Sequence, residues 1–499
     1  MGILRLLADT DLVPAALLER VFVTDFEGTP WPCNARFVAG SSSSLREIQI
    51  AVEGDHSFYL QIPLRTASGS ELMVSTATLR QREEPYLLAL ELLRGSIHRL
   101  TNQNFEWGRG GFALLEDADE RISDIMKRFT AVATIPHDWE RCHRQSMDIL
   151  PDVIKLVSGF SDGITAELTR MNATAGIETL LAGNWQDQAV ANVDMELFKS
   201  VFDTAIIDLD WPTIELSSGS YDWSRAKEQV RVCLEHGLRT ISGPLLDFSP
   251  SNIPGWMENW QSDPGRLTSR AMEYAVRTVE ALAGDIHLWN ITSTMNQPLS
   301  VGLSDQARLQ LTADVVQRVR RLEPKTPILV TFQQPWGEFL VGSEMPEVIS
   351  PLRFADALVR GQIGVSALGL QLDLGSWPYG SVERDAIEIL KRLDIWSRFQ
   401  LPLVVFLSSA SDPVAGGDSS DLAMTTHRSP TQNSQAATAK QMVQLLSAHP
   451  AVHGVVWNEW SDRANSRFPT CGIVDSDGNP KQAMMVLREL QLQQAAVAD

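Results

Sequence analysis

Cysteine is scarce in this 499-residue chain and forms no recognisable pattern. The four cysteines, Cys33, Cys142, Cys233 and Cys471, stand far apart and include no CxxC pair. This spacing argues against a disulfide framework and against a zinc-ligand motif. The nine histidines form no HExxH motif either. We therefore expect neither a metal site nor a cofactor.

Positive charge and long apolar runs are also in short supply. The chain has 42 Lys and Arg residues against 62 Asp and Glu residues, a formal net charge of −20. An acidic surface repels phosphate groups and anionic lipid headgroups, so we expect no nucleic-acid partner and no membrane. Apolar runs such as 403–407 have the length of strands, and the N-terminal run is broken by Arg5. We expect a cytoplasmic protein without a signal peptide.

The first third of the chain divides into two patterns. Over residues 1–112, short runs such as REIQIAVEG and SFYLQIPLRT alternate apolar and polar residues. They predict a β-rich, sandwich-like N-terminal module that either binds sugar or packs against the rest of the protein, and we favour packing. Over residues 113–175, apolar residues recur at spacings of three and four from Ile149 onward, which predicts a helical connector.

Residues 176–499 alternate short apolar runs with amphipathic stretches. The runs are LLAGNW, DTAIIDLDW, RTISGPLLDF, IHLWNITST, PILVTFQQ, VSALGLQLDL, LPLVVFL and VHGVVWNEW. Low charge in these runs is typical of strands covered on both faces. Eight strand–helix pairs favour a (β/α)8 TIM barrel, a fold of the α/β class. A doubly wound sheet fits less well because no Gly-rich phosphate loop follows any strand.

In a TIM barrel the functional site lies at the carboxyl ends of the strands. Those ends carry Asp208, Asp210, Trp211, Asp247, Trp289, Gln333, Gln334, Trp336, Gln371, Asp373, Trp457, Asn458, Glu459 and Asp462. Indole faces beside amides and carboxylates suit a neutral polyhydroxylated ligand such as a sugar. For each tryptophan, packing of a strand end against a loop is the competing interpretation, and we favour it.

Several segments in this region follow the order of a known family. They are IIDLDWPTIELSSGSYDWSRAKEQVRVCLEHGLRTISGPLLDF, HLWNITST, ALGLQLD, LPLVVFLSS and VHGVVWNEWSD. Over residues 180–490 the chain resembles glycoside hydrolase family ten, the β-1,4-xylanase family. The resemblance implies a TIM barrel and a neutral, xylan-like oligosaccharide or polysaccharide as partner. The substrate-binding residues it suggests are Trp211, Gln371, Trp457, Trp289 and Trp336.

The departures from the family concern its catalytic residues. Retaining glycosidases use two carboxyl groups, one as acid/base and one as nucleophile. At the family's positions this chain has Thr294 and Leu407, or Ser408 with a shift of one residue, and neither 286–304 nor 395–411 contains an Asp or Glu. A threonine hydroxyl has no accessible pKa near neutrality, and leucine cannot form a glycosyl ester. We therefore expect the family's retaining mechanism not to operate.

Two interpretations remain open. In the first, the barrel has lost hydrolysis and acts as a non-catalytic carbohydrate-binding or scaffold protein. In the second, it is an enzyme with relocated carboxylates, drawn from Asp208, Asp210, Asp247, Asp373, Glu459 and Asp462. Glu459 stands out because Trp457 and Trp460 flank it in the sequence, and apolar neighbours raise the pKa of a carboxyl group. For each acid, a solvated or structural role is the competing interpretation and the favoured one.

Two other segments deserve a prediction. Residues 159–163 match the GxSxG nucleophile elbow, but that motif needs a strand before its turn, and helical spacing runs through it here. We predict a helix and no esterase. Residues 408–433 form a long polar loop after the seventh strand, which is either a lid over the mouth or a disordered insertion.

Overall fold

The computed structural model describes most of the chain. The described residues are 2–38, 45–54, 56–65, 71–112, 117–135, 138–175, 178–185, 193–249, 252–257, 263–297, 302–340, 348–376, 380–412, 430–463 and 468–498. Most of the predicted 408–433 loop, whose role as lid or insertion was left open, lies outside them.

The N-terminal region contains two four-stranded sheets with a shared core, which confirms the predicted sandwich-like module. One sheet has the order β4-β5-β1-β8 and the other β3-β2-β6-β7. Strand bounds are β1 Gly2–Asp9, β2 Phe22–Thr24, β3 Pro30–Trp31, β4 Cys33–Phe37, β5 Leu45–Val52, β6 Tyr59–Arg65, β7 Glu71–Ser75 and β8 Tyr86–Leu87, with the short helix α1 Ala15–Leu18. In β1 the alternate residues Leu4, Leu6 and Ala8 are fully buried, as expected for a strand with one face on the core.

Three helices follow: α2 Leu88–Arg109, α3 Ala118–Ala133 and α4 Trp139–Ala175. Helix α4 runs unbroken through the GxSxG sequence, and Ser161 in its middle is 2% exposed. A nucleophile elbow requires a strand-to-helix turn with an exposed serine. The structure therefore confirms the helix and leaves no place for an esterase elbow.

Eight parallel strands form the C-terminal barrel, as predicted. They are β9 Leu180–Asn184, β10 Thr204–Ile207, β13 Arg239–Ser242, β14 Trp289–Asn290, β15 Ile328–Gln333, β16 Ala367–Asp373, β17 Leu403–Ser408 and β18 Val452–Trp457. Their order in the sheet is β13-β10-β9-β18-β17-β16-β15-β14. Parallel bridges between Ile241 and Leu288 and between Leu246 and Thr292 join the two ends of this order and close the ring. A closed ring leaves no sheet edge exposed.

Helices alternate with these strands and cover the barrel. They are α5 Met195–Lys199, α6 Trp211–Ile214, α7 Ser224–Glu235, α8 Pro264–Ala281, α9 Asp305–Leu322, α10 Pro351–Arg360, α11 Ala386–Ser397, α12 Gln432–Ala448 and α13 Gln482–Ala498, with a hairpin β11 Glu215–Ser217 and β12 Ser220–Tyr221 and a 3-10 turn η4 Glu338–Leu340. Several begin at a side-chain cap: Ser304 starts α9 and Asp385 starts α11, each accepting a backbone N–H bond.

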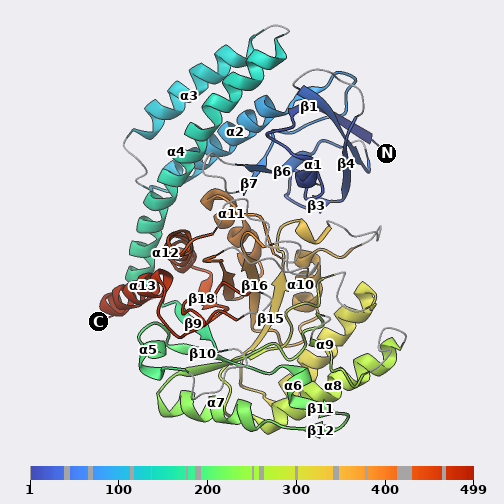
Figure 1. Cartoon of the computed structure of the whole chain (residues 1–499), viewed down its shortest axis with the longest axis vertical. Coiled ribbons are helices and arrows are strands. Elements are labelled where there is room, and N and C mark those ends of the chain that lie inside the picture. The colour runs from blue at the N-terminus through green and yellow to red at the C-terminus, as the bar shows by residue number, and fades with distance from the viewer. Residues whose placement is uncertain are drawn as a thin grey trace.

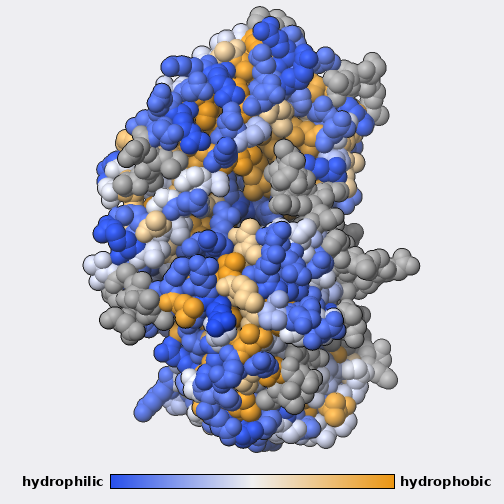
Figure 2. Space-filling view, turned by 60° about the vertical axis from the view of Figure 1, so that its left-hand side comes forward, coloured by the Kyte–Doolittle hydropathy of each residue, from blue (hydrophilic) through white to orange (hydrophobic). Residues whose placement is uncertain are grey.

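The module and the barrel lie one above the other in Figure 1, with α4 running down one side of both. Helix α4 contacts α2 and α3 at its upper end and α11 and α12 of the barrel lower down. Because α4 contacts both the N-terminal helices and the barrel, the domain boundaries at residues 112 and 175 remain a prediction from the sequence. Figure 2 shows a mostly hydrophilic face broken by hydrophobic patches. Within the described residues, no helix is long and apolar enough to cross a membrane.

A glycine at the barrel lets the module pack closely. A Cβ at Gly337, just after β15, would lie 2.5 Å from ring carbons of Phe22 in β2. We expect Gly337→Ala to lower the free energy of unfolding by about 1–3 kcal/mol, because backbone or ring must shift to relieve the overlap. Urea unfolding followed by tryptophan fluorescence measures this. Gly265→Ala on α8, where only a 3.7 Å contact would result, is the matched control and should change stability little.

Candidate functional site

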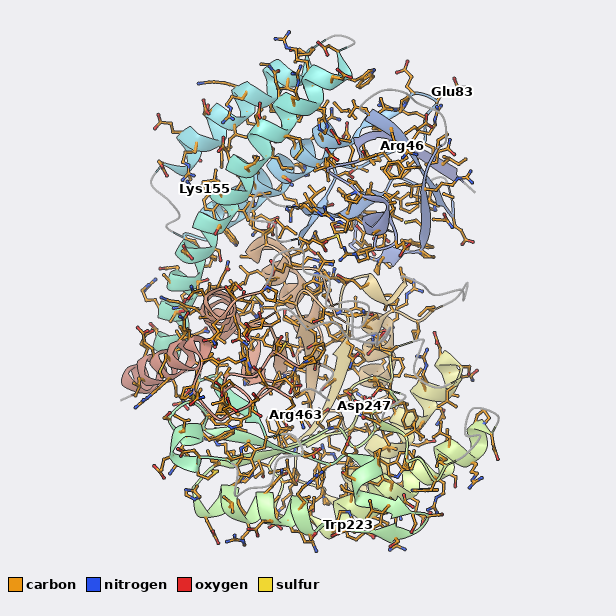
Figure 3. The ribbon with its side chains drawn as sticks, in the orientation of Figure 1. Arg46, Glu83, Lys155, Trp223, Asp247 and Arg463 are labelled. Carbon is orange, nitrogen blue, oxygen red and sulfur yellow. The ribbon has the colours of Figure 1, made fainter. Side chains whose placement is uncertain are left out.

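The carboxyl ends of the barrel strands bring most of the predicted site residues to one face. Gln333, Asp373 and Trp457 are the last residues of β15, β16 and β18, and Ser408 is the last residue of β17. Figure 3 shows Asp247 and Arg463, on the segments after β13 and β18, in the central part of the barrel. This face is the mouth of the barrel, and the fold alone accounts for the convergence.

Three carboxylates gather after β10 and β13. Asp208, Asp210 and Asp247 line a cavity of about 40 Å³ together with Asn252. Asp208 is held by Arg225 of α7, whose guanidinium lies 2.7 Å from its carboxylate. Asp247 accepts bonds from the backbone N–H and the hydroxyl of Ser249, at 2.9 and 2.8 Å. The cavity holds water molecules rather than a sugar ring at this size.

The surroundings of Asp210 change its acidity. Burial raises its pKa, and the neighbouring carboxylates of Asp208 and Asp247 raise it further, to about 7, against the opposing effect of Arg225. Burial also raises the pKa of Asp208, although Arg225 counteracts this. A carboxyl group with a pKa near 7 exists in both protonation states at neutral pH, which is what a general acid or base requires.

A second polar group lies across the ring. In the strand order, β10 and β16 are separated by three strands on either side, so Asp373 faces the Asp210 side. Its Oδ1 accepts a bond from Gln371 Nε2 at 2.8 Å and a longer one from Asn458 Nδ2 at 3.5 Å. The same Asn458 amide donates to Ser408 Oγ at 2.9 Å. Asp373 is 1% exposed, whereas Gln371 is half-buried, so Gln371 is the member of this group that presents surface to a ligand.

The acids that follow β18 have close partners. Glu459 is 7% exposed, and its carboxylate lies 3.9 Å from the guanidinium of Arg463. Asp462 pairs with the buried Lys481 at 2.5 Å and accepts the Gly472 N–H at 3.0 Å. Burial raises the pKa of Asp462, and Lys481 opposes this. Both contacts hold the Asp462 carboxylate in place, which is the arrangement expected of a structural hydrogen-bond acceptor.

Thr294 and Leu407, the two residues that the sequence resemblance places at the family's catalytic positions, are buried. Thr294 is 3% exposed, and its hydroxyl accepts the backbone N–H of Phe248 at 2.7 Å. Leu407 is 2% exposed within β17. The Thr294 hydroxyl thus serves to hold the loop after β13 against the segment after β14.

The tryptophans predicted to contact a ligand are buried in the structure. Trp289, Trp457, Trp336 and Trp211 are 0, 2, 3 and 4% exposed. The Trp211 indole N–H donates to Glu215 at 2.7 Å and its ring stacks on Tyr274. The other indoles have comparable packing, since Trp457 donates to the Cys471 carbonyl and Trp336 lies under the Arg384 guanidinium. The burial matches the packing interpretation, and it leaves little ring surface for a sugar to stack on.

Sequence reasoning missed the cations of the mouth. Arg225 and Arg463 both lie at the rim beside carboxylates, and neither was among the candidate site residues. Arg225 occupies the first turn of α7, directly after the hairpin that follows β10, and this position was the available signal. Nothing local distinguishes Arg463 in the sequence. Among the described residues, no group of His, Cys, Asp or Glu side chains has the geometry to hold a metal ion.

Comparison with known proteins gives matches at the level of structure only. No family profile matches the chain, and no curated protein matches it in sequence. A family-ten glycoside hydrolase from Paenibacillus barcinonensis is 16% identical, covering 64% of this chain and 96% of that one, with a TM-score of 0.48. Native xylanase 10B from Thermotoga maritima is 13% identical, covering 65% and 98%, with a TM-score of 0.48.

A third similar structure is xylanase 10B from Thermotoga petrophila in complex with xylobiose, which is 13% identical, covers 64% of this chain and 96% of that one, and has a TM-score of 0.46. The fold of the present chain rests on its own strand order, which is a closed ring of eight parallel strands. The chain has the (β/α)8 barrel that its resemblance to glycoside hydrolase family ten implies.

Proposed function

We propose that this protein is a xylanase-like barrel that binds a neutral, β-1,4-xylan-like oligosaccharide at its mouth without cleaving it by the retaining mechanism. The observation that carries the proposal is a pair of residues, Thr294 in the segment after β14 and Leu407 within β17. The ordered sequence segments that resemble family ten support the ligand class, and the amides and carboxylates at the strand ends are suited to sugar hydroxyl groups.

The chemistry of the two positions supports the loss of hydrolysis. A glycosyl–enzyme intermediate needs a carboxylate at one position, and departure of the leaving group needs a proton donor at the other. The Thr294 hydroxyl, which accepts the Phe248 N–H, is too weak an acid to protonate the leaving group, and an alkyl side chain at 407 supplies no nucleophile. A barrel with this pair can bind a glycan and release it unchanged.

One observation favours a second candidate function, an inverting hydrolase. Inverting enzymes place an acid and a base roughly 6.5–9.5 Å apart, with a water between the base and the sugar. Asp210, with a pKa of about 7, has the acidity of such an acid. Asp373 on the opposite strand is the base it would need. In this alternative both carboxylates act across the mouth, and Thr294 and Leu407 are irrelevant.

Overnight incubation with xylohexaose separates the two candidates. We expect mass spectrometry to show intact xylohexaose for the parent protein, while isothermal titration calorimetry with the same sugar gives a binding signal. The Asp210→Asn and Glu459→Ala variants run beside the parent, with Glu228→Gln on the outer surface of α7 as control. Shorter products from the parent that disappear in Asp210→Asn would establish the inverting alternative and overturn the non-hydrolytic proposal. Absence of any calorimetric signal would overturn the carbohydrate ligand.

A further inference from the structure

The N-terminal module contacts the barrel at loops that belong to the mouth. Leu72 of β7 forms a parallel bridge with Glu383, and the Met73 N–H donates to the Glu383 carbonyl at 2.9 Å. Glu383 lies in the segment between β16 and α11, so it follows a carboxyl strand end. Phe22 of the module packs at Gly337, just after β15. Both contacts are on the face where barrels bind their ligands.

An ion pair holds the C-terminal end of the loop that joins β16 to α11. Arg99 of α2 donates to both carboxylate oxygens of Asp385, at 2.7 and 3.3 Å, and the two side chains are 19 and 11% exposed. Asp385 is also the N-cap of α11 and accepts the Glu388 N–H at 2.9 Å. A two-point guanidinium–carboxylate bond specifies direction as well as distance. Arg99 therefore sets where the loop ends and α11 begins.

The β15 and β16 loops are tied to each other above this point. The Arg384 guanidinium binds Glu338 of η4 and lies 4.7 Å from the centre of the Trp336 ring. The Gln334 side chain donates to the Gly380 carbonyl at 3.0 Å. Gln334 has a φ of 49°, a left-handed conformation that is costly for a residue with a side chain and persists only when its surroundings hold it.

Residues of the loop after β16 contact the end of that strand, where Asp373 lies. The Ser381 N–H donates to the Asp373 carbonyl at 2.9 Å, and the Gly375 N–H donates to the Ser381 carbonyl at 2.8 Å. A Cβ at Gly380 would overlap the Asp373 carbonyl oxygen, so the loop lies directly on the strand end. The chain from Ser381 to Asp385 thus connects the hydrogen bonds at Asp373 to the ion pair with Arg99, and Glu338 binds Val382 and Arg384 between them.

We propose that the N-terminal module supports one side of the barrel mouth, and that Arg99 is a positioning residue for the loops that follow β15 and β16. The module stays attached to the barrel without this pair, because α4 contacts α11 and α12 independently. Loss of Arg99 therefore frees the loops without detaching the module. The consequence for ligand affinity rests on the proposed oligosaccharide function, whereas the positioning itself does not.

Hydrogen exchange without ligand tests the positioning. In the full-length Arg99→Gln protein we expect the amides of Met73, Gly375 and Ser381 to exchange about tenfold faster than in the parent. The Leu245 amide, which bonds to Asn290 at the barrel seam, should be unchanged. Arg99→Lys should recover part of the protection. Arg5→Gln is the matched control, because Arg5 forms a similar two-point bond with Glu47 within the module alone.

The outcomes separate the two claims. Unchanged exchange at Met73, Gly375 and Ser381, or an equal acceleration at Leu245, would overturn the positioning role, the second because Arg99 would then act on global stability. In calorimetry, Arg99→Gln should weaken xylohexaose binding about tenfold, while Arg5→Gln leaves it unchanged. If the parent itself does not bind xylohexaose, the proposed function fails, while the exchange result still decides the role of Arg99.

Discussion

Replacing Arg384 by methionine should lower the free energy of unfolding by about 3–5 kcal/mol. The Glu338 and Arg384 side chains are 0 and 2% exposed, and the carboxylate also accepts the N–H groups of Gly337 and Val382. Removal of the guanidinium leaves the buried Glu338 carboxylate with the coulombic interaction of Arg392 in place of a hydrogen-bonded cation, which is much more costly than the loss of a surface pair. Urea unfolding followed by tryptophan fluorescence gives the change.

Two further variants sharpen this result. Arg360→Met removes an exposed pair with Asp356, with side chains 80 and 42% exposed, and should change stability little. The double variant Glu338→Gln with Arg384→Met should be more stable than Arg384→Met alone, because it removes the buried charge together with its partner. An Arg384→Met cost no greater than that of Arg360→Met would contradict a buried ionised pair.

Asp210→Asn should stabilise the protein at pH 8, an unusual direction for a change at a buried polar residue. Burial and two neighbouring carboxylates raise the pKa of Asp210 from 3.8 to about 7. The folded state therefore holds the proton more tightly than the unfolded state, so stability falls as the pH rises from about 4 to about 7 and is level above that. Three pKa units correspond to about 4 kcal/mol, and we expect a gain of about 2–4 kcal/mol at pH 8.

The same variant should give no gain at pH 4, because Asp210 is then protonated in the folded state and is already neutral. Thermal unfolding at pH 4 and pH 8 measures both values. Asp222→Asn is the control, since hydrogen bonds from Ser224 lower the pKa of Asp222 and its removal should not stabilise the protein at either pH. A parent whose stability does not fall between pH 4 and 7, with no gain in Asp210→Asn, would show that Asp210 ionises normally.

The barrel was predictable from sequence because each strand is a continuous apolar run between amphipathic helices. This pattern can be recognised without knowledge of tertiary contacts. The order of strands placed Asp210, Asp247 and Asp373 at the mouth for the same reason, since all parallel strands end on one face.

What depends on tertiary packing was not predictable. The sequence shows Trp211, but it does not show that the Glu215 carboxylate and the Tyr274 ring contact its indole. Likewise, the pKa of Asp210 is raised first by burial and then by the carboxylates of Asp208 and Asp247, and Arg225 on α7 opposes this. These effects are set by distances between segments that are remote in the chain, and no periodicity in the sequence encodes them.

The pairing of β9 with β18 has a consequence for how the chain is made. One of the two neighbours of β9, the first barrel strand, is β18, the last one, and Leu180 pairs with Gly454. During synthesis, one edge of β9 therefore keeps its backbone N–H and C=O groups unpaired until β18 has left the ribosome. An open strand edge invites pairing with other chains. We expect the yield of folded protein to depend on chaperones and on translation speed, and C-terminal truncations that remove β18 to aggregate rather than to form a shorter barrel.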